Sequence, residues 1–175
     1  MLHGYPDLTI GLEGDFSYVD CKYRKGMRMS EVTIYTDGAC SGNPGAGGWS
    51  AILLCKGQSK QISGGETNTT NNQMELKAAL YALRALKRSS KVTIYSDSAY
   101  LVNAFKQGWI ANWMKSGWKT SSKKPVQNKE IWLALLQAIK PHDVTFVKVK
   151  GHANNQYNNE CDRLAKEAIT KIEKR

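Results

Sequence analysis

Two similar stretches, VTIYTDG at residues 32–38 and VTIYSDS at residues 92–98, determine which fold the chain can adopt. Each alternates apolar with polar side chains and is rich in β-branched and aromatic residues, the pattern of a half-buried β-strand. Each reaches an aspartate, Asp37 or Asp97, just before the chain turns. If the strands are parallel neighbours, both carboxylates lie at the sheet edge where α/β proteins form ligand sites. Alternatively, Asp37 belongs to an Asp-Gly turn and Asp97 caps a helix.

The flanking segments alternate between strand-like and helix-like patterns. Apolar residues at helical spacing predict a helix over residues 71–87, which Thr70 and Gln73 would begin with a capping box. Further strands are expected at residues 49–55, 58–63 and 143–149, and further helices at residues 98–105, 109–115, 128–139 and 158–172. This order predicts an α/β (mixed α+β) domain built on a mixed sheet.

The composition limits the class of protein. With 175 residues, 41% of them hydrophobic, the chain is long enough for one domain with its own core. It carries 25 Lys and Arg against 15 Asp and Glu, a net charge of +10, which favours a polyanionic partner such as nucleic acid. No apolar run reaches the ~20 residues of a membrane span, and the N-terminus lacks the apolar stretch of a signal peptide. We therefore expect a cytoplasmic protein that has no membrane partner.

The cysteines argue against a zinc protein. Cys21, Cys40, Cys55 and Cys161 are scattered and form no C-x-x-C pair. An intracellular setting favours free thiols over disulfides. We therefore predict that the four cysteines are structural or neutral.

The positive charge is concentrated in one part of the chain. Residues 98–129 contain no acidic residue. Six lysines in this stretch are interleaved with three tryptophans: Lys106, Lys115, Lys119, Lys123, Lys124 and Lys129, with Trp109, Trp113 and Trp118. Ordinary surfaces mix both signs of charge. The stretch therefore favours a protrusion that binds a polyanion over a solvated lysine face with core tryptophans beneath it.

Two further carboxylates are placed where they can join Asp37 and Asp97. Glu75 lies in the first turn of a predicted helix, at the border of its core-facing side, and Asp162 lies inside another amphipathic helix. Several carboxylates at one site repel one another unless a cation neutralises them. Oxygen ligands select hard ions such as Mg²⁺ or Mn²⁺. Beside a polyanion-binding surface, such a site suggests phosphodiester chemistry with two metal ions roughly 4 Å apart.

Five motifs carry a resemblance to a known family: TDGACSGNPGAGGW, TTNNQMEL, YSDSAY, GWKTSSKKPVQN and KVKGHANNQYNNECDRLA. In this order and spacing the chain resembles ribonuclease HI, the bacterial type 1 ribonuclease H, from about residue 31 to near the C-terminus. The resemblance implies a ribonuclease H-like fold, a five-stranded mixed sheet flanked by helices. It also implies endonucleolytic hydrolysis of the RNA strand in RNA–DNA hybrids, which leaves 5′-phosphate and 3′-hydroxyl ends.

The resemblance further assigns roles to individual residues. Asp37, Glu75, Asp97 and Asp162 would be catalytic and hold two Mg²⁺ ions, with Mn²⁺ as a substitute. The catalytic residue His152 would assist proton transfer or product release from a loop. The substrate-binding residues would be Asn43, Asn71 and Asn72 in the minor groove, Thr70 and Asn128 at a DNA phosphate, and Trp109, Lys119, Lys123 and Lys124 along the DNA strand. The partner would be the hybrid duplex, bound by a monomer.

The chain departs from the family pattern at four positions. Asn68 stands where relatives often have an arginine in the phosphate pocket, and Ala99 stands where a bacterial relative has glutamine. In the histidine loop, Asn154 replaces a frequent glycine and Asn159 replaces a usual glutamate. None of these changes removes a catalytic acid.

Two further expectations concern the domain boundaries and the kind of activity. We expect residues 1–30, whose net charge is zero, to form a poorly ordered N-terminal extension, and residues 31–175 to form the catalytic domain. The alternative to an endonuclease is a catalytically silent module that binds the hybrid. A proofreading exonuclease of the same superfamily usually carries Asp-x-Glu on its first strand, which Asp37-Gly38-Ala39 does not supply.

Overall fold

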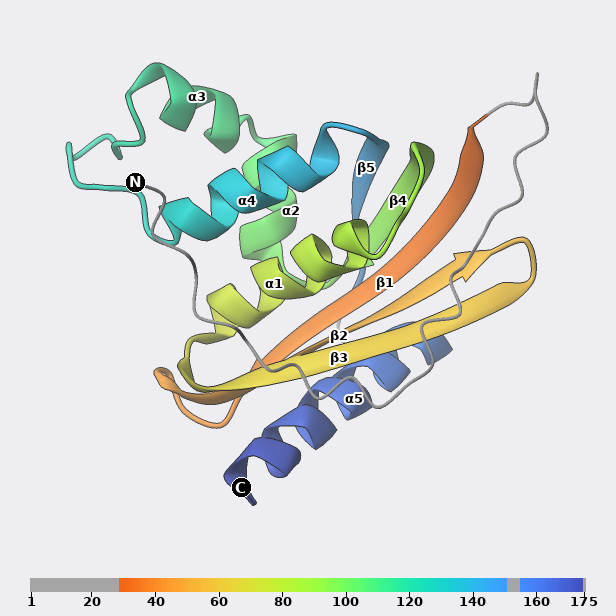
Figure 1. The fold of residues 1–175 in the computed structure, drawn as a ribbon. Coiled ribbons are helices and arrows are strands. Elements are labelled where there is room, and N and C mark those ends of the chain that lie inside the picture. Colours follow the sequence, from red (N-terminus) through yellow and green to blue (C-terminus); the bar gives the residue numbers. More distant parts are fainter. Residues whose placement is uncertain (1–28, 151–154, 175) are drawn as a thin grey trace, which may run out of the picture.

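A computed structural model describes residues 29–150 and 155–174, which form one five-stranded mixed sheet flanked by helices (Figure 1). The strands are β1 (Ser30–Cys40), β2 (Gly45–Cys55), β3 (Gln58–Thr69), β4 (Ser90–Ser96) and β5 (Asp143–Lys148), in the spatial order β3-β2-β1-β4-β5. The pairs β1–β2 and β2–β3 are antiparallel, whereas β1–β4 and β4–β5 are parallel. The expected mixed sheet is therefore confirmed.

The helices cover both faces of the sheet (Figure 1). They are α1 (Asn71–Arg84), α2 (Ala99–Lys106), α3 (Trp109–Lys115), α4 (Lys129–Ile139) and α5 (Gln156–Glu173). On one face α1 packs against β1, β2 and α4, while α5 packs against β1, β2 and β3 on the other. The main core lies between the sheet and α1, where Ile34, Leu76, Ile94 and Trp132 are fully buried. Among the described residues, no helix combines the length and apolar character of a membrane span.

The glycine-rich stretch at residues 38–48 is largely strand, since β1 runs to Cys40 and β2 begins at Gly45. Its glycines allow helices to approach the sheet closely. A Cβ on Gly48 would lie 2.1 Å from the carbonyl oxygen of Ala165 on α5. The absence of that carbon lets α5 lie directly against β2, where Ser50 Oγ donates a hydrogen bond to the Cys161 carbonyl at 2.7 Å.

The predicted elements differ from the observed ones mainly at their ends. The third strand runs to Thr69 because it stays paired with β2 beyond its apolar part, and α1 stops at Arg84 instead of residue 87. The prediction of free thiols holds for Cys40 and Cys161 but is wrong for Cys55, which is disulfide-bonded.

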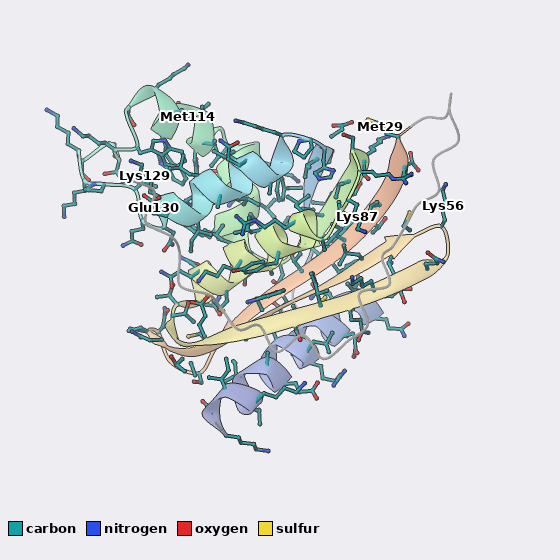
Figure 2. The ribbon with its side chains drawn as sticks, in the orientation of Figure 1. Met29, Lys56, Lys87, Met114, Lys129 and Glu130 are labelled. Carbon is teal, nitrogen blue, oxygen red and sulfur yellow. The ribbon has the colours of Figure 1, made fainter. Side chains whose placement is uncertain are left out.

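Residues 109–128, named here the lysine protrusion, stand away from the sheet beyond α4 (Figure 1). In Figure 2 the exposed Met114 marks α3 in this region, and Lys129 marks the start of α4. Trp113 lies at the centre of an aromatic cluster, with ring centroids 6.1 Å from both Trp109 and Trp118 and 5.6 Å from Trp132. The tryptophans thus anchor the protrusion to the core, and its lysines remain outside.

Candidate active site

The two strand-end aspartates meet because β1 and β4 are parallel and in register. The pairing runs through Thr36 and Ser96, the residues directly before Asp37 and Asp97. Asp37 is buried, whereas Asp97 is half-buried in the turn before α2. The prediction that these carboxylates lie side by side at one sheet edge is therefore confirmed. Ser98, not Asp97, caps α2, with Ser98 Oγ accepting from Leu101 N at 3.1 Å.

Glu75 reaches the same place from α1. A Cβ on Gly38 would lie only 2.3 Å from the backbone nitrogen of Glu75, so the missing side chain at residue 38 is what allows α1 to touch β1 there. Asp37, Glu75 and Asp97 each offer one carboxylate oxygen, and these three oxygens all lie within 4.8 Å of one another. Sequence reasoning selected the three residues, and the fold brings them together.

Asp162 approaches from the opposite face on α5. The residue before it, Cys161, is buried and fastens the helix to the sheet, because its thiol donates to the Tyr35 carbonyl at 3.4 Å. The Asp162 carboxylate is partly exposed, and its Oδ2 accepts a hydrogen bond from Lys166 Nζ at 2.8 Å. It stands outside the group of three oxygens, yet its charge acts on Asp37.

The electrostatics of the site are unfavourable without a cation. Burial, followed by the charges of Asp97 and Asp162, raises the pKa of Asp37 from 3.8 to about 7. Burial and the charges of Asp37 and Asp97 likewise raise the pKa of Glu75 well above its usual value. Glu75 Oε2 is buried and has no hydrogen-bond partner within the described part of the chain. A buried acceptor without a donor costs free energy, so this oxygen is suited to a ligand.

These residues fit a divalent metal ion. The donor set consists of carboxylate oxygens, which hard cations such as Mg²⁺ and Mn²⁺ prefer. A cation between Asp37, Glu75 and Asp97 would remove their mutual repulsion and satisfy the unpaired Glu75 oxygen. The geometry therefore supports a divalent-ion centre at this edge of the sheet.

All three residues predicted to contact the minor groove lie near the start of α1. Asn71 and Asn72 are exposed in its first turn, and Asn43 Oδ1 accepts from Asn71 N at 3.3 Å, which joins the β1–β2 loop to the helix. Thr70 caps α1, since its Oγ1 accepts from Gln73 N at 3.3 Å. The expected helix start at Thr70 is confirmed, and Thr70, Asn71 and Asn72 precede Glu75 by three to five residues in the sequence.

The other predicted substrate contacts lie on and beside the lysine protrusion. Lys119, Lys123 and Lys124 are exposed, while Trp109 is half-buried at the start of α3. Asn128 is half-buried immediately before α4, and its amide oxygen accepts from Gln73 Nε2 at 3.2 Å. That bond joins the beginning of α1, with Thr70, to the beginning of α4.

The remaining singled-out positions fall into two groups. Asn68, Ala99 and Asn159 are exposed on the surface. His152 and Asn154 lie outside the described residues, as does the greater part of the N-terminal extension.

Sequence reasoning missed Lys148. It is the last residue of β5 and pairs with Ser96, and its Nζ donates to the Asp97 carbonyl at 2.7 Å and to the Val149 carbonyl at 3.2 Å. This lysine therefore ties the end of β5 to the backbone that carries one of the clustered acids. In the sequence it is one of many lysines, and only the β4–β5 register distinguishes it.

Comparison with known proteins identifies the family of the chain. A family model for RNase H matches residues 29–170. A ribonuclease H from Caldanaerobacter subterraneus subsp. tengcongensis is 61% identical over 140 residues, covering 80% of this chain and 92% of the relative. A ribonuclease H from a Thermoanaerobacter species is 62% identical over 138 residues, covering 79% and 89%. The chain belongs to the ribonuclease H family.

Solved structures share the fold. LC9-RNase H1, described as a type 1 RNase H with the type 2 active-site motif, has a TM-score of 0.74 at 28% identity, covering 84% of this chain and 75% of that one. LC11-RNase H1 in complex with an RNA/DNA hybrid has a TM-score of 0.63 at 24% identity, covering 81% and 98%. The mixed sheet and its flanking helices are therefore those of the family.

Proposed function

We propose that this chain is an endoribonuclease that hydrolyses the RNA strand of RNA–DNA hybrids and leaves 5′-phosphate and 3′-hydroxyl ends. The observation that carries the proposal is the meeting of Asp37, Glu75 and Asp97 within 4.8 Å in a protein whose net charge is +10. A module that only binds nucleic acid gains nothing from buried carboxylates that face phosphates. Membership of the ribonuclease H family supports the same activity.

In this proposal, Asp37, Glu75, Asp97 and Asp162 hold two Mg²⁺ ions. The ions would lower the pKa of the attacking water and neutralise charge on the scissile phosphate. Gly38 and the β1–β4 register keep the carboxylates of Asp37, Glu75 and Asp97 in place before the metal binds. Lys166 holds the carboxylate of Asp162 at 2.8 Å and limits its rotation. His152 would move a proton near the leaving group, a role that rests on the sequence motif alone.

Substrate recognition is proposed to divide between the two sides of this centre. Asn43, Asn71 and Asn72 are suited to hydrogen bonds with 2′-hydroxyls and base edges in the minor groove, which distinguish RNA from DNA. Trp109 and the exposed lysines Lys119, Lys123 and Lys124 are suited to the DNA strand. Thr70 and Asn128 are suited to one DNA phosphate beside α1 and α4.

The experiment that tests the proposal is a cleavage assay on an RNA–DNA hybrid with each strand labelled in turn. Internal cuts are expected in the RNA strand, in the presence of Mg²⁺, and not in single-stranded RNA, duplex RNA or EDTA. Binding without cleavage in both Mg²⁺ and Mn²⁺ would instead identify a silent hybrid-binding module. Cuts confined to strand ends would identify an exonuclease.

We further propose that residues 31–175 form the catalytic domain, preceded by an extension of residues 1–30, and that the chain acts as a cytoplasmic monomer. The family match to residues 29–170 supports the domain boundary. A cytoplasmic location suits an enzyme whose substrate arises where bacterial DNA is copied and transcribed. Light scattering of the pure protein, with and without residues 1–28, tests the oligomeric state and the independence of the domain.

A further inference from the structure

The side chain of Gln73 does not complete the capping box of α1. In a capping box the residue at this position reaches back to the backbone nitrogen of the capping residue. Here Gln73 Nε2 instead donates to Asn128 Oδ1 at 3.2 Å, and Gln73 Oε1 accepts from Thr69 Oγ1 at 2.8 Å. The glutamine amide thus connects the start of α1 to the residue before α4, some 55 positions along the chain.

The hydroxyl group of Tyr100 determines which group donates and which accepts in the hydrogen bonds between Gln73 and Asn128. Tyr100 Oη lies 3.0 Å from Trp132 Nε1, which can only donate, and 3.3 Å from the carbonyl oxygen of Gln127, which can only accept. The tyrosine hydroxyl therefore accepts from the tryptophan and gives its single proton to Gln127. It has no proton left, so the neighbouring amide of Asn128 must donate to it.

This requirement orients the Asn128 amide. Asn128 Nδ2 faces Tyr100 Oη at 3.4 Å, so Asn128 Oδ1 faces Gln73. Gln73 must then present its NH₂ group to Asn128 and its oxygen to Thr69. Rotation of the Asn128 amide by 180° would set its oxygen against the oxygen of Tyr100 and its NH₂ against the NH₂ of Gln73, which would leave partly buried polar groups unpaired.

We propose that Gln73 and Tyr100 are positioning residues that fix Asn128 as a hydrogen-bond donor toward a phosphate of the DNA strand. The second hydrogen on Asn128 Nδ2 has no acceptor among residues 29–150 and 155–174, so it is available to an external oxygen. An unconstrained amide would present its oxygen to the anion as readily as its nitrogen. The proposal rests on the proposed function, because that function supplies the phosphate.

The main test is the affinity for a fluorescently labelled RNA–DNA hybrid, measured by anisotropy in EDTA so that no cleavage occurs. The change Gln73→Glu replaces the donor with a carboxylate, which attracts the Asn128 NH₂ group away from the ligand. We expect affinity to fall about tenfold, and about threefold for Gln73→Met, which removes one neutral hydrogen bond. In the cleavage assay KM should rise by the same factors, with kcat unchanged.

Double variants separate this role from simple charge repulsion. In an Asn128→Ala background, Gln73→Glu is expected to cause no further loss, because its effect passes through the Asn128 amide. Additive losses, or an unaltered affinity of Gln73→Met and Gln73→Glu, would overturn the proposal. Thermal unfolding of each variant identifies any loss of affinity that comes from misfolding. Gln73→Met removes the hydrogen bond without adding a charge, so a loss of affinity in this variant does not come from charge repulsion.

A modified substrate tests the identity of the ligand. Methylphosphonate replacement of single phosphates in the DNA strand should lower wild-type affinity at one position, and Gln73→Glu should be insensitive at that position. An identical methylphosphonate profile for both proteins would overturn the proposal. Because binding is measured without metal, a wild type that binds the hybrid but never cleaves it would refute the proposed activity and leave this inference separately testable.

Discussion

The acidic centre, formed by Asp37, Glu75 and Asp97, and the lysine protrusion carry opposite charges. They also differ in how the fold holds them. Asp37 and Glu75 are each 6% exposed and held by backbone contacts between β1 and α1. Lys119, Lys123 and Lys124 are exposed, on a loop whose shape depends on the tryptophan cluster and on the isolated bridge between Lys119 and Pro125. The acidic centre therefore holds its carboxylates in a defined arrangement, whereas the lysine protrusion is suited to long-range attraction of a polyanion.

This difference has energetic consequences. Like charges at a buried site interact strongly because little water screens them, so the neighbouring carboxylates add to the effect of burial in raising the pKa values of Asp37 and Glu75. Exposed lysines are screened by salt, and each contributes a small, replaceable part of the binding free energy. We therefore expect variants of the centre to change the chemical step by large factors, and variants of the protrusion to change binding gradually.

The largest expected effect is the loss of cleavage in Asp97→Asn. The amide keeps the shape of the side chain but removes the charge that holds the metal, so kcat should fall about a thousandfold or more. Hybrid affinity, measured by anisotropy in EDTA, should stay close to that of the wild type. Normal cleavage by this variant would refute the assignment of the acids and remove the basis of the comparison.

The next largest effect concerns stability without metal. The pKa of Asp37 is about 7 in the folded protein, against 3.8 for the ordinary side chain. Between these values the folded state retains a proton that the unfolded state has lost, so stability falls as the pH rises through this window, and the full cost applies above it. The cost is on the order of 4 kcal/mol.

Asp37→Asn removes this cost, and the variant should therefore unfold at a higher temperature than the wild type in EDTA at pH 8. At pH 4 the Asp37 carboxyl group is largely protonated in the folded state and about half protonated in the unfolded state, so the difference in unfolding temperature between the two proteins should largely disappear. Added Mg²⁺ should stabilise the wild type much more than the variant. Calorimetry at the two pH values provides the measurement, and an equal difference at both would contradict the titration of Asp37.

Variants of the lysine protrusion should change how hybrid binding depends on salt concentration. Replacing Lys119, Lys123 and Lys124 together with alanine should weaken hybrid binding and make its salt dependence shallower, by roughly one slope unit for each lost phosphate contact. A matched variant with alanine at Lys140, Lys171 and Lys174 removes the same charge from exposed positions elsewhere. If both variants shift the slope equally, net charge and not the protrusion governs binding.

A smaller effect is expected at Lys148, an exposed lysine whose ammonium group bonds to the backbone of Asp97. Lys148→Met keeps the length of the side chain but removes the hydrogen bonds to the carbonyls of Asp97 and Val149. A less rigid Asp97 should lower kcat about fivefold and increase the Mg²⁺ concentration needed for half-maximal rate, with KM for the hybrid unchanged. Lys140→Met is the control, and an equal response there would exclude a positioning role.

Much of the fold could be predicted because its patterns are local. The alternation in VTIYTD and VTIYSD indicated two strands, and the apolar spacing after Thr70 indicated α1. The extent of the strands was not predictable in the same way. Residues 38–48 are rich in glycine, which is typical of a loop, but most of them pair across β1 and β2, where Gly38 and Gly48 allow α1 and α5 to approach the strands closely.

The site was predictable as a set of residues and not as an arrangement. Asp37 and Asp97 end similar strands, and Glu75 and Asp162 lie on the inner sides of predicted helices, so residue type and spacing selected all four. Their separation depends on the β1–β4 register and on Gly38, which only the folded sheet shows. The hydrogen bonds of Lys148 and Gln73 left no sequence signal, because each joins residues some 50 positions apart.

By itself, the sequence determined the mixed α/β class, the excess of positive charge, the four acids and the family they resemble, because periodicity, composition and motif spacing are properties of the chain. Tertiary structure alone decided that three carboxylates share one site, that Asp162 stands apart beside Lys166, and that the Asn128 amide has a single orientation. The physical reason is that burial and hydrogen-bond direction depend on neighbours in space, and the fold sets these neighbours through contacts distant in the chain.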